Sequence, residues 1–325
     1  MSQFQDLPNE NILKVLSYLK VKDLLCCGQV SKRIRAISHD KSLYQKINLN
    51  GKKVQTRFLE RIINKGCKDL NLSRAQLEGS EFNLNEMSEL RCLNLDFCVA
   101  SIKDMKVLTD SCVNLQMISI RNLTKFSLSS ITSKIMENIC NQNGQTLEVL
   151  NLESHTGTVL SGAVLSEDLI WIITEKCAVL KEVNFNNTGL SYDSIDILVK
   201  NLTPSVQSFS LQHCYSVGDW QIDTLVKRCN QIRFLDLKYT GISSNCLPEI
   251  IRNLKDSLEE LNFQTYYFDF IQHENSLAKL FGLKSLTKFK TLRITICGFM
   301  EKRLKEELFG VVIDNQKTDG KFCCP

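Results

Sequence analysis

The chain has 325 residues, of which 43% are hydrophobic and 23% are charged, so it can bury a sizeable core and does not have the composition of a disordered protein. Its formal net charge of +4 is too small to indicate nucleic-acid binding. The sequence contains neither a long apolar run nor an N-terminal leader. We therefore expect an intracellular protein, in the cytoplasm or nucleus or both, with reduced thiols and no membrane partner.

Residues 1–45 predict three short helices. Pro8 stands at the first helical turn, the second helix starts at the acidic residue Asp23, and the third, residues 31–37, is basic and amphipathic. Within the first helix, apolar residues recur at helical spacing, at Ile12, Leu13, Leu16 and Leu19. Three helices of this size bury little surface on their own. One interpretation is therefore a cap that shields the segment that follows.

From Tyr44 onward, one pattern, apolar-x-x-apolar-x-apolar, recurs ten times. Its alternating half predicts a short strand with one buried face, and the stretches between matches, such as residues 169–173 and 222–226, predict helices. Ser101 and Asp104 have the spacing of a helix N-terminus. The ten matches are Tyr44/Ile47/Leu49, Cys67/Leu70/Leu72, Leu90/Leu93/Leu95, Leu115/Ile118/Ile120, Leu147/Leu150/Leu152, Leu180/Val183/Phe185, Val206/Phe209/Leu211, Ile232/Leu235/Leu237, Leu258/Leu261/Phe263 and Phe289/Leu292/Ile294.

A single strand–helix unit cannot bury its own apolar face, so the units must stack on one another. The predicted fold class is α/β: a horseshoe-shaped solenoid with about ten parallel strands on its concave face and helices on its convex face. The wide spacings from Leu115 to Leu147 and from Leu147 to Leu180 predict longer helices or loops, and not missing strands.

Five of the 14 cysteines stand at repeating positions. Cys98 and Cys214 follow the last apolar strand position by three residues, and Cys112, Cys177 and Cys229 precede the first apolar position by three residues. A small thiol buried between repeats accounts for both positions. No zinc-type spacing of Cys or His, no phosphate loop and no nucleophile elbow is present, so the sequence predicts no metal, no cofactor and no catalytic residues.

The N-terminal segment closely resembles an F-box, and the repeats resemble the cysteine-containing subfamily of leucine-rich repeats. The F-box resemblance is carried by Leu7-Pro8-x-Glu10-x-Ile12-Leu13-x-x-Leu16-x-x-Leu19, Asp23-Leu24-Leu25, Val30-Ser31-Lys32-Arg33 and Ser42-Leu43-Tyr44. We accordingly predict an F-box at residues 1–45, a leucine-rich-repeat solenoid at 46–296, and a C-terminal cap and tail at 297–325. Cys67-Lys-Asp69 is superficially similar to the Cys-x-Asp motif of bacterial effector ligases with leucine-rich repeats, but Cys67 occupies a core position of its repeat.

The resemblance implies a non-catalytic substrate receptor of a ubiquitin ligase. An F-box docks on the Skp adaptor and, through it, on a cullin–RING ligase, while the repeats select proteins for ubiquitination and proteasomal degradation, cell-cycle regulators among them. The candidate adaptor-binding residues are Leu7, Pro8, Ile12, Leu13, Leu16 and Leu24, and the sequence does not separate docking residues from internal core. The alternative is a plain interaction or inhibitor protein whose N-terminal helices are only a cap.

Side chains that alternate with the apolar strand positions point onto the predicted concave face. The candidate substrate-binding residues there are Asn151, Asn184, Asp236, Lys238, Asn262, Gln264, Tyr266 and Arg293. Residues 279–305 are rich in Lys and Arg, which we interpret as ordinary surface in preference to a site for an acidic partner. Because the resemblance also implies phosphorylated substrates, we expect Lys238 and Arg293 to matter more for binding than Asn94.

Overall fold

The structure, a computed structural model, describes residues 7–79, 82–121, 129–154, 165–264, 274–296 and 298–315. The chain forms two compact units, one of Met1–Ile118 with Leu123–Lys125 and the other of Ser119–Asn122 with Phe126–Pro325. The first unit contains the N-terminal helices together with the first repeats, and the second contains the later repeats. The domain boundaries predicted after residues 45 and 296 stay predictions.

The three N-terminal helices form as predicted. They are α1 (Asn9–Leu16), α2 (Val21–Cys27) and α3 (Lys32–Ser38), followed by a 3-10 turn at Lys41–Tyr44. The Ser31 hydroxyl caps α3 by accepting a hydrogen bond from the Ile34 N–H at 3.1 Å. Tyr44 is fully buried at the join to the repeats, and its hydroxyl donates to the Ser38 carbonyl at 2.9 Å.

In the first unit, parallel strands β1 (Lys46–Asn48), β3 (Asp69–Asn71) and β5 (Cys92–Asn94) pair in chain order. Their register aligns the core residues Ile47, Leu70 and Leu93. Helix α4 (Thr56–Ile63) lies between β1 and β3 in the chain, and α5 (Ile102–Asp110) follows β5. Ser101 caps α5 through the Asp104 N–H as predicted. Strand β6 (Met117–Ser119) lies where the two units meet in the sequence.

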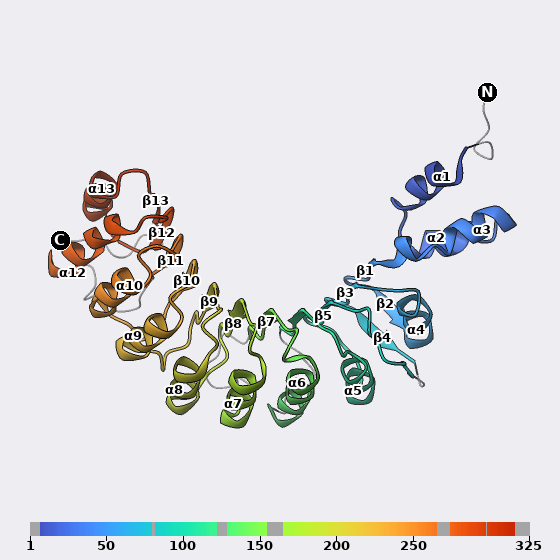
Figure 1. Cartoon of the computed structure of the whole chain (residues 1–325), viewed down its shortest axis with the longest axis horizontal. Coiled ribbons are helices and arrows are strands. Elements are labelled where there is room, and N and C mark those ends of the chain that lie inside the picture. Colours follow the sequence, from blue (N-terminus) through green and yellow to red (C-terminus); the bar gives the residue numbers. More distant parts are fainter. Residues whose placement is uncertain are drawn as a thin grey trace. The chain divides into compact units, whose positions relative to one another are not determined.

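The second unit is a longer run of the same strand–helix pairs. Within it, the strands line the concave side, and helices α6 to α10 line the convex side (Figure 1). Strands β7 to β13 pair in parallel and in chain order. The strands are β7 (Val149–Asn151), β8 (Glu182–Asn184), β9 (Ser208–Ser210), β10 (Phe234–Asp236), β11 (Glu260–Asn262), β12 (Thr291–Ile294) and β13 (Val312–Asn315). The helices are α6 (Ser129–Asn143), α7 (Glu167–Lys176), α8 (Tyr192–Asn201), α9 (Asp219–Arg228), α10 (Leu247–Asn253), α12 (Glu274–Phe281) and α13 (Gly298–Glu307), with 3-10 turns at Ser244–Cys246 and Gly282–Ser285.

All ten predicted strands are present, which confirms the α/β repeat fold. The 15-residue helix α6 fills much of the wide spacing after Leu115, as predicted, whereas residues 155–164 of the next wide spacing lie outside the described residues. The predicted thiols are also confirmed as core, since Cys98, Cys112, Cys177, Cys214 and Cys229 are all buried.

Three further strands were not predicted. β2 (Lys53–Gln55) and β4 (Gln76–Glu78) form a separate two-stranded sheet, each with one buried residue, which is too short an apolar pattern to recognise. β13 extends the main sheet beyond β12 and lies within the segment expected to be a cap and tail. Its register pairs Ile313 with Leu292, but places Asn315 beside Ile294, so the repeat pattern is interrupted there.

A recurrent turn follows the strands. The side-chain oxygen of the last strand residue accepts the N–H two residues later, as Asn71 does from Ser73 and Asn184 does from Asn186, both at 2.9 Å. After the turns at Asn48, Asn71, Asn94, Asn184 and Asp236, the next residue takes a left-handed conformation, with φ between 54° and 66°. The same hydrogen bond is made by Asn48, Asn94, Asn151 and Asp236. The left-handed residues after these turns are Gly51, Arg74, Phe97, Asn187 and Tyr239, and His213 is left-handed after a turn whose Gln212 N–H donates to the Asn186 side chain.

No helix in the described residues is both long and apolar enough to cross a membrane.

Candidate protein-interaction surfaces

The N-terminal helices enclose a small core. Ile12, Leu16 and Leu24 are almost fully buried there, together with Ile34 and Ile37. Three of the six candidate docking residues, Ile12, Leu16 and Leu24, thus lie inside the helices and do not offer a contact surface. The prediction that these three residues bind the adaptor was wrong because helical spacing identifies one apolar stripe, and in a three-helix unit that stripe faces the other helices.

Other apolar side chains of the helices and of the turns that join them face solvent. Leu7 and Leu13 are half-buried at the margin of the core, and Pro8 is exposed. Val15 near the end of α1 and Tyr18 and Leu19 in the turn that follows are also exposed, with Tyr18 80% accessible. Val30 is 74% accessible. We call Pro8, Val15, Tyr18, Leu19 and Val30 the exposed apolar set, and large exposed apolar side chains of this kind are typical of protein interfaces.

Side chains of α3 hold the helices together. The guanidinium of Arg33 donates to the Asn9 side-chain oxygen at 2.9 Å and to the Leu7 carbonyl at 2.6 Å. The guanidinium of Arg35 donates to the Gly28 carbonyl at 2.8 Å, and so connects α3 to the end of α2. These contacts fix the position of the segment that carries Leu7 and Pro8.

In the second unit, strand register arranges the outward side chains in rows across neighbouring strands. The first row is Glu182, Ser208, Phe234, Glu260 and Thr291, and the second row is Asn184, Ser210, Asp236, Asn262 and Arg293. Asn151 extends the second row onto β7. The second row therefore contains the candidates Asn151, Asn184, Asp236, Asn262 and Arg293. Lys238 and Gln264 lie two residues beyond it, and Tyr266 lies outside the described residues.

Many side chains of the second row make contacts within the chain. The turn hydrogen bonds use the side-chain oxygens of Asn151, Asn184 and Asp236. Burial raises the pKa of Asp236, and hydrogen bonds from the Lys238 N–H and the Asn262 side chain oppose that rise. Asn262 and Gln264 are buried, each with a side-chain oxygen that has no hydrogen-bond partner.

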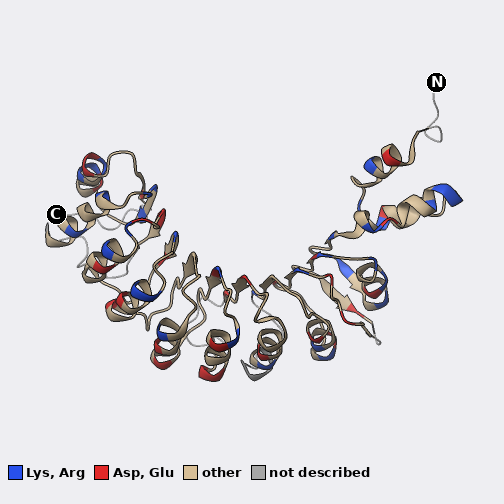
Figure 2. Cartoon of the chain, viewed as in Figure 1, with Lys and Arg blue, Asp and Glu red and all other residues tan. Residues whose placement is uncertain are grey.

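The cations of this face are also largely compensated. Arg293 lies 3.0 Å from the Glu260 carboxylate and 3.7 Å from that of Asp314. Lys181 lies 2.8 Å from Glu148, while Arg233 and Lys290 both pair with Glu259. The ammonium of Lys238 lies 4.9 Å above the ring of Tyr239. Figure 2 shows charges of both signs interleaved along the second unit.

A shallow groove of about 350 Å³ runs over the start of strands β8 to β11. It is lined by Lys181, Glu182, Gln207, Ser208, Arg233, Phe234, Glu259 and Glu260. None of these residues is among the predicted site residues. The sequence could have singled out Phe234, because the other strands place a smaller or polar residue at its position in the row. It could not have singled out Glu182, because the lack of an ion-pair partner for its carboxylate depends on contacts that the sequence does not show.

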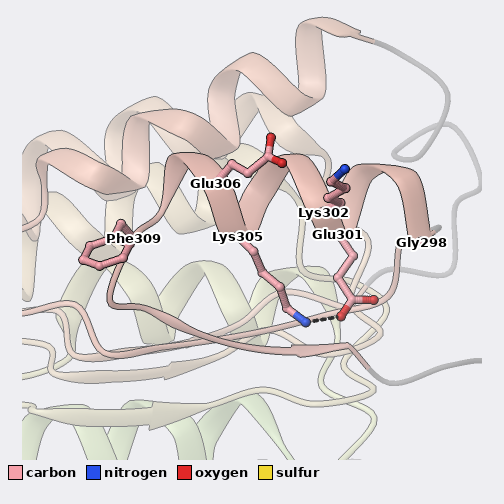
Figure 3. Close-up of a pocket in the computed structure, with 6 residues that line it drawn as sticks. All are labelled: Gly298, Glu301, Lys302, Lys305, Glu306 and Phe309. Atoms are coloured by element: carbon pink, nitrogen blue, oxygen red, sulfur yellow. Dashed lines mark hydrogen bonds and ion pairs between the residues drawn. The ribbon is translucent and has the colours of Figure 1, made fainter.

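A second recess lies beside α13 (Figure 3). The Lys305 ammonium and the Glu301 carboxylate project to the same side of the helix and pair at 2.6 Å, while Glu306 and Lys302 lie higher on the helix. Phe309 at its margin is 95% accessible, so this recess is an open surface and not an enclosed site. The lysines of residues 279–305 also make ordinary surface contacts, such as that of Lys284 with Glu307 at 3.2 Å.

Cys67 does not have the properties of a nucleophile. Its side chain is 2% accessible, and burial raises the pKa of its thiol to about 12. In the described residues, no cluster of His, Cys, Asp or Glu has the arrangement of a metal site.

The family comparison addresses the N-terminal helices. Residues 4–50 match the model of the F-box-like family. The chain carries an F-box-like domain. This domain comprises the three helices, their small core and the exposed apolar set.

Solved structures match the chain at low sequence identity. A chain of the yeast Rad7 and Elc1 complex is 13% identical, with 96% of this chain and 89% of that chain covered and a TM-score of 0.51, which shows a similar fold. The leucine-rich-repeat-containing protein LegL7 from Legionella pneumophila is 15% identical, covering 82% of this chain and 81% of its own at a TM-score of 0.43. The tropomodulin C-terminal domain from Caenorhabditis elegans is 17% identical, covering 45% and 92% at a TM-score of 0.38. The F-box-like domain is followed by strand–helix repeats, and the chain as a whole has a fold similar to that of the Rad7–Elc1 chain.

Proposed function

We propose that this chain is the substrate-recognition subunit of an SCF-type ubiquitin ligase. The observation that supports the proposal best is the F-box-like domain with its exposed apolar set, on the same chain as a long parallel-stranded repeat region. In this role the helices bind a Skp adaptor and, through it, a cullin–RING ligase, in the cytoplasm or nucleus. The strand face of the repeats holds the protein to be ubiquitinated and degraded, cell-cycle regulators among the expected targets.

The chain's contribution to catalysis in this role is proximity. Holding a target beside the ligase raises the effective concentration of its lysines at the ubiquitin donor, so the transfer becomes close to intramolecular. No nucleophile of this chain is needed, and the buried Cys67 thiol supplies none. Bond formation belongs to other subunits.

The docking surface we propose is the exposed apolar set, with Leu7 and Leu13 at its margin. Side chains such as Val15 and Tyr18 gain from leaving water when a partner groove covers them. A charge placed there enters the contact without a partner and weakens binding strongly. Because both residues are solvent-exposed in the free chain, the same change leaves the fold intact.

The test is a pull-down of the purified full chain with purified Skp adaptor, in the presence and absence of cullin. We expect wild type to bind, and Val15→Asp and Tyr18→Asp to lose at least about tenfold in affinity with unchanged circular dichroism. Tyr192→Asp, on an exposed residue of α8, is the matched control and should bind as wild type does. Failure of the wild-type chain to bind would favour the alternative, in which the helices only cap the first repeat.

A further inference from the structure

The groove on β8–β11 has one carboxylate that is not compensated. Glu260 pairs with Arg293 and Glu259 pairs with Arg233 and Lys290, so those acids are already neutralised. Glu182 is exposed, and its carboxylate makes no ion pair or hydrogen bond with any other part of the chain that the structure describes. The groove lining has three acids and two bases, which gives it a net charge of −1.

An aromatic ring stands opposite this free carboxylate. Register pairs Glu182 with Ser208, and Ser208 with Phe234, so the first row places the small Ser208 between an acid and a phenyl ring. Since neighbouring strands lie about 4.8 Å apart, the Glu182 and Phe234 backbones are about 10 Å from one another. The space above Ser208 can therefore admit one side chain that contacts both walls.

Glu182 and Phe234 together favour one kind of side chain on a bound segment. The face of a phenyl ring attracts cations, and a free carboxylate accepts hydrogen bonds from them. An arginine side chain satisfies both, because its planar guanidinium stacks on aromatic rings and donates in a fork to a carboxylate. Lys181 and Arg233 at the groove already pair with Glu148 and Glu259, which leaves no free cation in the groove lining to bind a phosphate.

We propose that the slot above Ser208, between Glu182 and Phe234, is a specificity subsite for an arginine side chain on the bound protein segment. This inference rests on the proposed function only in treating that segment as part of a ubiquitination target. It assigns to the strand face an unphosphorylated basic segment in place of the phosphorylated one that the family resemblance implied.

The experiment is selection of random dodecapeptides displayed on phage, using the purified full chain as bait. Wild type should enrich peptides with arginine, and the best of them, synthesised, should bind Glu182→Gln about tenfold more weakly in calorimetric titration. Phe234→Leu should weaken binding less, and Glu182→Lys should turn the selection toward acidic peptides. Glu175→Gln on α7, the same substitution on a helix of the convex side (Figure 1), should behave as wild type does.

Three outcomes would overturn the inference: no enrichment of arginine by wild type, equal arginine enrichment by Glu182→Lys, or preferred binding of a phosphoserine variant of the selected peptide. Adaptor binding is measured separately on the same variants. If arginine selection holds while the adaptor does not bind, the subsite stands and the ligase role falls. If the adaptor binds and arginine selection is absent, the opposite holds.

Discussion

Cys67 shows how burial governs the chemistry of a single side chain. Its neighbour two residues on, Asp69, gives it the Cys-x-Asp spacing, but the thiol lies in the core of the first unit and contacts the Asp69 carbonyl at 3.4 Å. Removing a thiolate from water disfavours it, so the pKa of this thiol rises to about 12. Only about one molecule in ten thousand would carry a thiolate at pH 8.

We therefore expect Cys67 to resist alkylation in the folded chain. With iodoacetamide at pH 8, the exposed Cys26 should be modified within minutes, and Cys67 only after denaturant unfolds the first unit. Mass spectrometry of tryptic peptides at successive times measures both rates in one sample. Modification of Cys67 as fast as Cys26 in the native chain would contradict its assignment as a core thiol.

At the scale of the element, the recurrent turn explains why Asn is so frequent at the strand ends. The Asn71 and Asn94 oxygens accept the N–H two residues later, and in both cases the next residue is left-handed. The sequence pattern suggested a polar binding surface instead, because alternation shows only that a side chain leaves the core. It does not show that a short amide turns back to its own backbone.

The turn can be tested at Asn71. Replacing it by Ala removes the hydrogen bond to the Ser73 N–H and should lower the free energy of unfolding by about 1 kcal/mol in urea titrations. Asn71→Asp is the matched control, since Asp236 shows that a carboxylate makes the same bond. Equal losses for the two variants would mean that the acceptor oxygen is unimportant.

The helices show a different limit of sequence reasoning. Their existence and order follow from apolar spacing and from the start signals at Pro8 and Asp23, and the structure confirms them. Which apolar residues face inward depends on how three helices pack together. Ile12 and Val15 differ by less than one turn, yet the first is fully buried and the second is exposed. Only the three-dimensional arrangement separates core from docking surface.

At the scale of the whole molecule, the strands were the most predictable part because all ten obey one rule of burial: residues that alternate in sequence share a face. The last strand, β13, does not follow that rule, because it places Asn315 beside Ile294. The partners of charged residues could not be read from the sequence either. Arg293 was expected to contribute its charge to target binding, and the structure pairs it with Glu260 and Asp314, more than twenty residues away on either side.

The central claim is a division of labour, in which the N-terminal helices bind the ligase adaptor and the repeats remain free for a target. Amide hydrogen exchange of the full chain, with and without purified Skp adaptor, tests this claim most directly because it reports every segment in one experiment. We predict slower exchange within residues 7–45 and unchanged exchange in strands β8 to β11. Protection of those strands by the adaptor, or no protection anywhere in residues 7–45, would contradict it.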